Sequence, residues 1–431
     1  MSTLADRIRG IVRPAAAPPP AAVPIEPCPG SLEPVLGGAW RGAPGASCFV
    51  VERRWARSAR YGRTVVGDVA NRLEAACDAA ALFSGGAEAR PPFVFFDLET
   101  TGLSGGAGTH AFLVGCGWFD ADASFVTRQF LMTRFADERA VLAAVAAEIG
   151  RAGALVSFNG KSFDAPVLET RYLFHRLPWM GGEIPHIDAL HPARRFWPGD
   201  CSLVSLERQL LETRRVGDVS GFEIPARYFQ YIRDGNPRPL VPVLEHNRLD
   251  LLTLATLTSR LLHLARGGAA SARDGREAYA LGLMYARAGL DEQARECFTR
   301  AVTMCSAPAG AFDPVRIEGL RALALAWRRA RQWEEAAACW RQLLETRGCP
   351  PAIRREATEA LAIHHEHRVR DLALAKTFAL RTLENELTPA WARAAQHRIA
   401  RLERKLEGEN QKFEVRSLKF EGGKLEFEAG S

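Results

Sequence analysis

Residues 93–106, "FVFFDLETTGLSGG", decide the fold, because they join a buried strand to a pair of acids. Four apolar residues open the stretch, and such a run predicts a strand inside a sheet. Asp97 and Glu99 follow, and the two-residue period of a strand puts both carboxylates on one side and Leu98 on the other. Two like charges directed at one point repel each other and are costly to bury. We therefore expect a cation between them.

The composition indicates a globular protein of two or three domains. The chain has 431 residues, of which 47% are hydrophobic and 25% charged, and this length exceeds one ordinary core. No apolar run approaches the roughly 18 residues of a membrane span, and the charged N-terminus does not resemble a signal peptide. Nine cysteines without a CxxC pair argue against a disulfide framework or a zinc cluster. We expect a cytoplasmic protein that does not contact a membrane.

The net charge is mildly basic. A charge of +6 and an isoelectric point near 8.9 permit a nucleic-acid partner without requiring one. The identity of the partner must therefore come from the motifs.

Strands and helices alternate in the middle of the chain, which predicts a mixed sheet flanked by helices. A Gly/Ala/Ser-rich stretch, "ARGGAASARDG", then leads into a purely helical region. The last residues alternate polar and apolar about a Gly-Gly pair, which is a hairpin signal. The expected regions are a disordered Pro/Ala-rich lead-in at 1–37, an N-terminal arm packing on the next domain at 38–91, the α/β domain at 92–266, helical repeats at 274–405, and a Lys-rich tail forming a hairpin at 406–431.

The helical region resembles tetratricopeptide repeats. Small residues such as Gly282 and Ala294 would let two antiparallel helices approach closely, and about three repeats are needed to bury a continuous core. Trp327 and Trp340 belong to a looser second copy, where core positions are the simplest interpretation. We expect this array to bind a protein partner. The first copy is carried by Leu281, Gly282, Tyr285, Gly289, Ala294, Phe298 and Ala301.

Two further motifs supply acids that belong with Asp97 and Glu99. In "SFNGKSFDAPVL" Asp164 opens a helix just after a strand, and in "EHNRLDLLTL" His246 and Asp250 are four residues apart, which is one face of a helix. Four carboxylates from three elements are what a two-magnesium site requires, with ions about 4 Å apart. Oxygen ligands suit Mg²⁺ or Mn²⁺. We therefore expect two such ions, held by Asp97, Glu99, Asp164 and Asp250.

The three motifs resemble those of the DEDD-type nucleases, which have a ribonuclease-H-like fold. "TGLSGGAGT" and "GDVSGFEIPARYFQYI" make the chain similar to the YprB-type ribonuclease-H-like proteins over about residues 38–262. The resemblance implies an α/β ribonuclease-H-like domain followed by an all-α, tetratricopeptide-like domain. The implied activity is that of a metal-dependent 3′–5′ exonuclease.

The same resemblance assigns roles to the acids. Asp97 would bridge both ions, Glu99 and Asp250 would complete one metal site, and Asp164 would act mostly through water. These enzymes carry either His-x4-Asp or Tyr-x3-Asp in the third motif, whereas this chain has the histidine at the tyrosine's spacing. A histidine exchanges a proton near neutral pH, so His246 is the expected general base.

Further residues would contact the substrate strand. The resemblance implies that Leu103 wedges against the terminal base, that backbone groups near Thr100 hold the 3′ end, and that Asn159 faces the strand. Lys161 would meet a phosphate. Arg194 and Arg195 stand beside Phe196 and Trp197, a combination found on single-strand binding surfaces, and Arg214 and Arg215 are comparable.

Other candidates have simpler interpretations. Asp164 could be a helix N-cap. His186 and Asp188 could be extra ligands but more often cap a strand, and His110 and His175 are weaker candidates still. Two rival functions remain open: a non-catalytic nucleic-acid-binding or scaffold protein on the same fold, and an endonuclease of the ribonuclease H kind.

Overall fold

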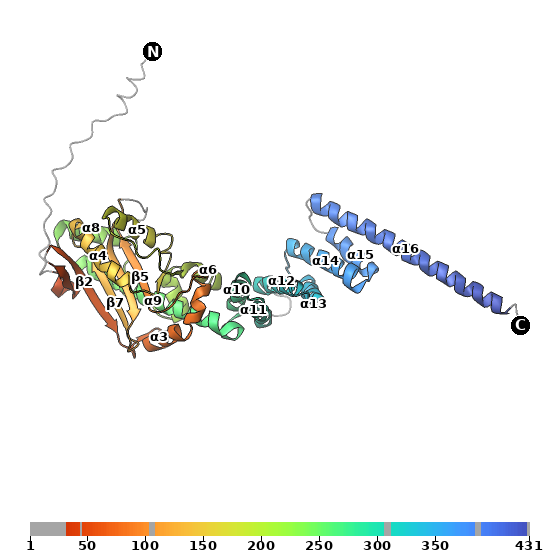
Figure 1. Cartoon of the computed structure of the whole chain (residues 1–431), viewed down its shortest axis with the longest axis horizontal. Helices are drawn as coiled ribbons and strands as arrows, with labels where there is room; N and C mark the ends of the chain where they lie inside the picture. Colours follow the sequence, from red (N-terminus) through yellow and green to blue (C-terminus); the bar gives the residue numbers. More distant parts are fainter. Residues whose placement is uncertain (1–31, 44, 103–107, 306–311, 384–388, 429–431) are drawn as a thin grey trace, which may run out of the picture. The chain divides into compact units, whose positions relative to one another are not determined.

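The computed structural model of this chain describes residues 32–43, 45–102, 108–305, 312–383 and 389–428 (Figure 1). It divides into two compact units. The first comprises Met1–His191 and Asp200–Arg260, and the second comprises Pro192–Gly199 and Leu261–Ser431. The division after the α/β region therefore falls at Arg260, inside a helix, rather than in the Gly/Ala/Ser-rich stretch where the sequence predicts it.

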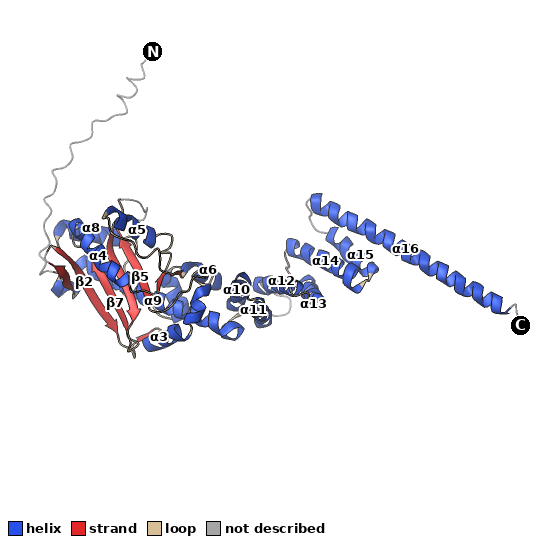
Figure 2. Ribbon diagram, in the orientation of Figure 1, coloured by secondary structure: helices blue, strands red, loops and turns tan. Residues whose placement is uncertain are grey.

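The first unit is built on a seven-stranded mixed sheet (Figure 2). The strand order is β1-β2-β7-β6-β5-β8-β9. β5 pairs with β8, and β8 with β9, in parallel, and the other neighbours are antiparallel. The predicted mixed sheet is thus confirmed. Its strands are β1 (Ala39–Ala43), β2 (Ala46–Trp55), β5 (Phe93–Thr100), β6 (Ala111–Phe119), β7 (Phe125–Leu131), β8 (Ala154–Ser157) and β9 (His186–Asp188), while β3 (Arg60–Tyr61) and β4 (Thr64–Val65) form a separate pair.

β5 lies inside the sheet between β6 and β8, which explains its apolar start. Phe93, Phe95 and Phe96 are buried, and the exposure increases only where the acids begin. Because β8 runs parallel to β5, both strands end at the same edge of the sheet. The chain segments that follow β5 and β8 therefore start side by side.

Helices cover both faces of the sheet. A Cβ atom on Gly115 of β6 would lie 2.2 Å from Oδ1 of Asn247, so α9 (Val241–Gly267) lies directly against β6. The neighbouring Cys116 points to the opposite face, where α4 (Glu138–Ile149) packs on β2, β6 and β7. Glycine at position 115 is what allows the close approach of α9.

Two more helices lie on the α4 side. α8 (Ile224–Asp234) stacks Tyr228 on Phe112, with ring centroids 4.0 Å apart. α5 (Asp164–Phe174) is joined to α4 because the Tyr172 hydroxyl donates a hydrogen bond to the Leu142 carbonyl at 2.6 Å. The remaining segments of this unit are α3 (Val66–Ala75), η2 (Cys77–Leu82), η3 (Phe135–Asp137), α7 (Leu203–Leu206), η4 (Glu207–Leu211) and η5 (Arg238–Leu240).

The N-terminal part is more ordered than the sequence predicts. β1 and β2 of the expected arm join the sheet of the domain, because β2 pairs with β7 from Phe49 to Trp55. The end of the expected disordered lead-in is also structured. α2 (Glu33–Leu36) begins with a proline in its first turn and ends at Gly37, and Leu32 and Leu36 are buried. Residues 1–31 of that lead-in lie outside the described residues.

The second unit is helical, and each of its long helices packs on the next one in the chain. A Cβ atom on Gly282 would lie 2.5 Å from the Phe298 ring, so the expected close approach of the first two helices is present. Trp340 is buried, as predicted, and Trp327 is partly exposed beneath Arg295. The assignment to tetratricopeptide repeats and the protein partner remain predictions. The helices are α6 (Leu190–Phe196), η6 (Gly268–Ser271), α10 (Gly275–Arg287), α11 (Asp291–Met304), α12 (Pro314–Arg329), α13 (Trp333–Glu345), α14 (Pro351–His364), η7 (His365–Val369), α15 (Leu372–Leu383) and α16 (Pro389–Glu428).

The hairpin predicted for residues 406–431 is wrong. α16 continues as one helix through the Gly-Gly pair to Glu428. The segment is rich in glutamate, lysine and leucine, which are strong helix formers, and it prolongs a helix that has already begun. The two glycines destabilise the helix by about 2 kcal/mol. They do not make a hairpin by themselves, because a hairpin also needs two strands that pair.

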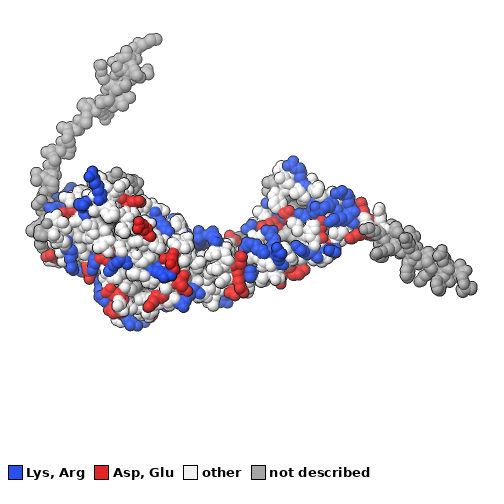
Figure 3. Space-filling view, viewed as in Figure 1, with Lys and Arg blue, Asp and Glu red and all other residues white. Residues whose placement is uncertain are grey.

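No helix among the described residues is long and apolar enough to cross a membrane. On the face drawn in Figure 3, basic and acidic side chains are interspersed. This face therefore shows no continuous basic surface for a nucleic acid. The carboxylates at the sheet edge are a more specific indication of function.

Candidate active site

The two acids of β5 lie at the end of the strand, as their spacing predicts. Leu98 is buried in the core, while Asp97 and Glu99 are only partly buried on the other side of the strand. The pairing with β6 shifts register between Glu99 and Thr100. This irregularity ends the regular ladder just after the second acid.

Asp164 reaches the same edge from β8 through a short loop. Asn159 adopts a left-handed φ of 68°, and Asp188 fixes the loop by accepting hydrogen bonds from the backbone N–H groups of Asn159 (2.8 Å) and Lys161 (3.1 Å). Asp164 is the first residue of α5 and is buried; the N-cap position belongs to Phe163. The simple N-cap interpretation of Asp164 is therefore wrong.

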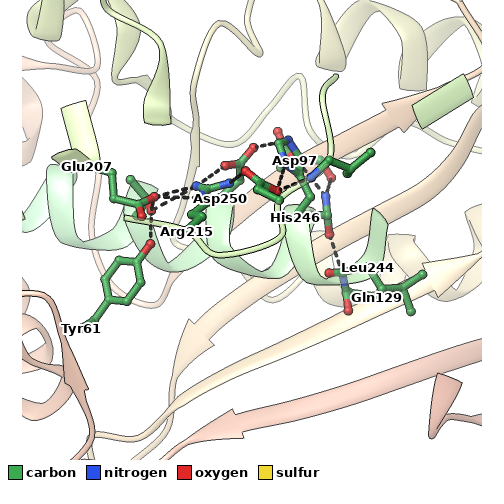
Figure 4. A network of polar contacts seen from close by, with 12 residues as sticks. Tyr61, Asp97, Gln129, Glu207, Arg215, Leu244, His246 and Asp250 are labelled. Atoms are coloured by element: carbon green, nitrogen blue, oxygen red, sulfur yellow. Dashed lines mark hydrogen bonds and ion pairs between the residues drawn. The ribbon is translucent and has the colours of Figure 1, made fainter. Parts of the chain in front are cut away.

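The third motif lies on α9 and joins a buried network (Figure 4). His246 Nε2 lies 3.4 Å from Asp250 Oδ2, and His246 Nδ1 lies 2.7 Å from Asp218 Oδ1. The Arg215 guanidinium donates to Asp250 Oδ1 at 2.6 Å and to Glu207 at 2.8 Å. Asp250 is thus held by a cation on one oxygen and faces His246 with the other.

Arg215 is not a substrate-facing residue. Its side chain is 3% exposed, and the Glu207 carboxylate that it contacts also accepts from Thr253 at 2.9 Å. Thr253 in turn shares a hydrogen bond of 2.6 Å with the Tyr61 hydroxyl. The expectation that Arg215 binds a strand is therefore wrong: it is an internal ion-pair partner of Asp250.

The charges of the acids in the three motifs act on one another. Burial raises the pKa of Asp97 well above its ordinary value, and the charges of Asp250, Glu99 and Asp164 raise it further. Burial likewise raises the pKa of Glu99, followed by the charges of Asp250 and Asp164. Acids from β5, α5 and α9 thus repel one another across a shared space.

The pKa of Asp164 is raised as well, to about 7, by burial and then by the charge of Asp188. Such raised values mean that the folded protein resists collecting these negative charges. A cation among them would reverse the effect.

The donor set fits a hard divalent cation in chemistry, because all four groups are carboxylates. Among the described residues, however, no three His, Cys, Asp or Glu side chains already stand close enough to hold a metal ion. Asp250 is also engaged with Arg215. Binding would therefore require the carboxylates to close around the ion.

Two residues that the sequence analysis did not single out orient Asp97. Asn247 is fully buried, and its amide donates to Asp97 Oδ2 at 2.8 Å and to the Asp97 carbonyl at 3.2 Å. Gln129, buried on β7, donates to Asn247 Oδ1 at 2.9 Å. Asn247 lies within "HNRLD" and could have been suspected there, whereas nothing in the sequence marks Gln129.

Arg194 and Arg195 belong to the second unit, and their aromatic neighbours are not a surface, since Phe196 and Trp197 are buried. The Trp197 ring donates to Glu277 at 3.0 Å. The predicted single-strand surface is therefore wrong in its aromatic half.

The other substrate candidates stay near the first two motifs. Asn159 and Lys161 are exposed on the loop before Asp164. Thr100 is buried and donates its hydroxyl to the Gly102 carbonyl at 2.9 Å. Leu103 lies outside the described residues.

The weaker ligand candidates have structural partners. Asp188 holds the loop before Asp164, and His186 contacts the Ser157 hydroxyl at 2.7 Å. His110 and His175 both contact Glu138, at 3.0 and 2.7 Å. These contacts fit structural roles for the four residues, as strand-end caps or core hydrogen-bonding groups, rather than metal ligation.

A mixed sheet with acids at the end of one inner strand, at the start of the helix that follows the parallel neighbouring strand, and on a helix packed across the sheet is typical of a ribonuclease-H-like domain. A family description, RNase_H superfamily, matches residues 94–262. The chain is also 32% identical over 318 residues to "Uncharacterized protein YprB" of Bacillus subtilis (strain 168), a match that covers 72% of this chain and 74% of that protein. The chain belongs to the YprB family of the RNase_H superfamily.

Among solved structures, the chain is similar to the family B DNA polymerase from the archaeon Pyrobaculum calidifontis. The TM-score is 0.34 and the identity 16%, over 46% of this chain and 30% of that one. A likeness of this degree says nothing about function.

Proposed function

We propose that this protein is a metal-dependent 3′–5′ exonuclease that hydrolyses nucleic-acid phosphodiesters by a two-ion route. The proposal is supported by four acids from three elements, whose charges raise the pKa values of Asp97 and Glu99, inside an RNase_H superfamily domain. Asp97, Glu99, Asp164 and Asp250 would hold Mg²⁺ or Mn²⁺. Ions bound there would activate water and neutralise charge on the leaving oxygen.

The surrounding residues have defined tasks in this proposal. Asn247 keeps one Asp97 oxygen and the strand end in place, and Arg215 keeps one Asp250 oxygen in place. The Asp218 carboxylate beside Nδ1 favours the proton on that nitrogen, which would leave Nε2, 3.4 Å from Asp250 Oδ2, to accept a proton from water. The chain therefore supplies a base oriented by a carboxylate.

End-labelled oligonucleotides test the proposal. Incubation of the wild-type protein with a 5′-labelled strand and Mg²⁺ or Mn²⁺ should give a ladder that shortens one nucleotide at a time and disappears with chelator. Cuts only in mid-strand would favour the ribonuclease H kind of endonuclease instead. Binding without any product would favour the non-catalytic scaffold.

Asn247→Leu should weaken metal activation. Removing the amide frees the Asp97 carboxylate to turn away, and partners that orient metal ligands are usually worth about 10–100-fold in metal affinity or activity. We expect the Mn²⁺ concentration for half-maximal hydrolysis to rise by about that factor. Asn71→Leu, at an exposed position on α3, is the control. Equal Mn²⁺ dependence in both variants would mean that Asn247 does not position Asp97.

The metal-free protein should lose stability as the pH rises from 5 to 8. Asp97, Glu99 and Asp164 have raised pKa values, that of Asp164 about 7. The folded state therefore holds protons that the unfolded chain has already released, and the stability present near pH 4 is lost as the pH passes through the folded-state values.

Burial lowers the pKa of His186 to about 4, and this histidine makes the protein more stable as the pH rises over part of the range. Both the wild type and Asp97→Asn contain His186, so the difference between their melting temperatures reports the effect of Asp97. Each kcal/mol is about 2–4 °C of melting temperature in a unit of this size. We expect the wild type to fall by about 5 °C more than the variant, and Mn²⁺ to restore it at pH 8. Parallel curves, with no response to Mn²⁺, would contradict the repulsion.

A further inference from the structure

A cavity of about 560 Å³ is lined in part by Arg215 and Asp218, which contact Asp250 and His246 of α9. Its lining includes Arg208, Thr213 and Arg214, and it is completed by Glu207, Arg215 and Asp218. The segment between η4 and α8 supplies most of this lining. We call this space the arginine pocket.

The wall of the arginine pocket is continuous with the proposed catalytic residues. Arg215 lines the pocket and contacts Asp250 at 2.6 Å, and Asp218 lines it and contacts His246 at 2.7 Å. A ligand in the pocket would therefore lie one side chain away from Asp250 and His246.

The charges of the wall divide into two groups. Glu207 is 2% exposed and is bound by Arg215, and Asp218 is bound by His246 and, at 3.4 Å, by Arg215. Both acids thus have partners within the protein, and Arg215 is a cation that they share with Asp250. Arg208 and Arg214 are exposed and line the pocket.

A strand that approaches four carboxylates is repelled by them, so cations next to the acids are needed to hold its backbone. Guanidinium groups bind phosphate oxygens in pairs of parallel hydrogen bonds, and the Thr213 hydroxyl adds a neutral donor. The volume lies within the roughly 300–1,000 Å³ of ligand pockets. It can admit a phosphodiester with its sugar.

We propose that the arginine pocket, through Arg208 and Arg214, binds a backbone phosphate of the nucleic-acid strand next to the phosphodiester that is cut. The proposal rests on the proposed nuclease function and adds a named phosphate subsite to it. Arg215 is excluded as a contact, because Asp250 and Glu207 hold its guanidinium.

Binding tests the subsite without hydrolysis. In an Asp97→Asn background, the fluorescence anisotropy of a labelled single-stranded oligonucleotide is followed as the protein is added, over a series of salt concentrations. Arg214→Ala should weaken binding about tenfold, and the slope of log affinity against log salt should fall by about 0.7 for each phosphate that the variant no longer neutralises. Both arginines are exposed, so these variants are expected to fold.

Arg41→Ala is the matched control. Arg41 is exposed on β1, the edge strand, and three strands separate it from β5, or about 19 Å at the usual strand spacing. The control should keep the affinity and the salt slope. Equal behaviour of the Arg208→Ala/Arg214→Ala double variant and the control would overturn the subsite.

A second substrate separates failure of the subsite from failure of the nuclease. The p-nitrophenyl ester of thymidine 5′-phosphate has no neighbouring phosphodiester, so Arg214→Ala should leave its hydrolysis unchanged while KM for the oligonucleotide rises. Equal losses on both substrates would contradict the subsite. If the wild type cuts neither substrate but the double variant still loses binding, the nuclease proposal fails and the phosphate subsite stands.

Discussion

Replacing Asp97 by asparagine is expected to lower the rate of phosphodiester hydrolysis by about a thousandfold. Asp97 is the acid that the proposal places between both ions, and it is held by Asn247 in the space shared with Glu99, Asp164 and Asp250. The charge stabilisation that ions supply is worth several kcal/mol, and about 4 kcal/mol corresponds to about a thousandfold in rate. Initial rates on an end-labelled oligonucleotide with Mg²⁺ give the value directly.

The matched control for Asp97→Asn is Glu245→Gln. Glu245 is an exposed acid on α9, next to His246 in the sequence, and it pairs with Arg248 at 2.6 Å. It should keep the wild-type rate. A rate for Asp97→Asn within about tenfold of the wild type would leave too small a barrier change, about 1.4 kcal/mol, for a residue that anchors two ions.

Arg215→Leu is expected to destabilise the first unit by about 3–5 kcal/mol. The substitution leaves Glu207 and Asp250 without their cation in a place where the Arg215 side chain is 3% exposed and that of Glu207 2%, and an uncompensated buried charge costs about that much. The hydrogen bond from Thr253 to Glu207 remains but carries no charge. Urea unfolding should show the loss as a lower midpoint.

Arg214→Leu is the neighbouring control for this prediction. Its side chain is exposed, and surface substitutions of this kind usually change the free energy of unfolding by less than about 0.5 kcal/mol. Two variants of equal stability would show that Arg215 is not the internal counter-charge of Asp250.

The local part of the site was predictable from the sequence because it depends on short-range periodicity. The alternation of β5 places Asp97 and Glu99 on one side of the strand, and the four-residue spacing places His246 and Asp250 on one helix face. The parallel pairing of β5 with β8, in which Phe95 faces Val156, brings the segment with Asp164 to the β5 acids, and the packing of Asn247 on Gly115 brings α9 to the sheet. The spacing of residues along the chain does not predict such long-range contacts, and only the family resemblance indicated that the three motifs meet.

The errors arise where long-range contacts overrule local signals. The local sequence of β2 does not indicate which strand it pairs with, and its partner β7 lies about 75 residues further along the chain. Arg215 reads as a surface cation, yet its partners Glu207 and Asp250 are on other elements. The Gly-Gly pair near the C-terminus is a turn signal only when two strands flank it, and α16 shows that helix formers surround it instead.

If Asp97, Glu99, Asp164 and Asp250 together hold divalent cations, isothermal titration of the metal-free protein with Mn²⁺ measures that binding. The wild type and Glu245→Gln should bind Mn²⁺ saturably, and Asp97→Asn should lose this binding. Absence of Mn²⁺ binding by the folded wild type, or equal binding by Asp97→Asn, would contradict the proposal.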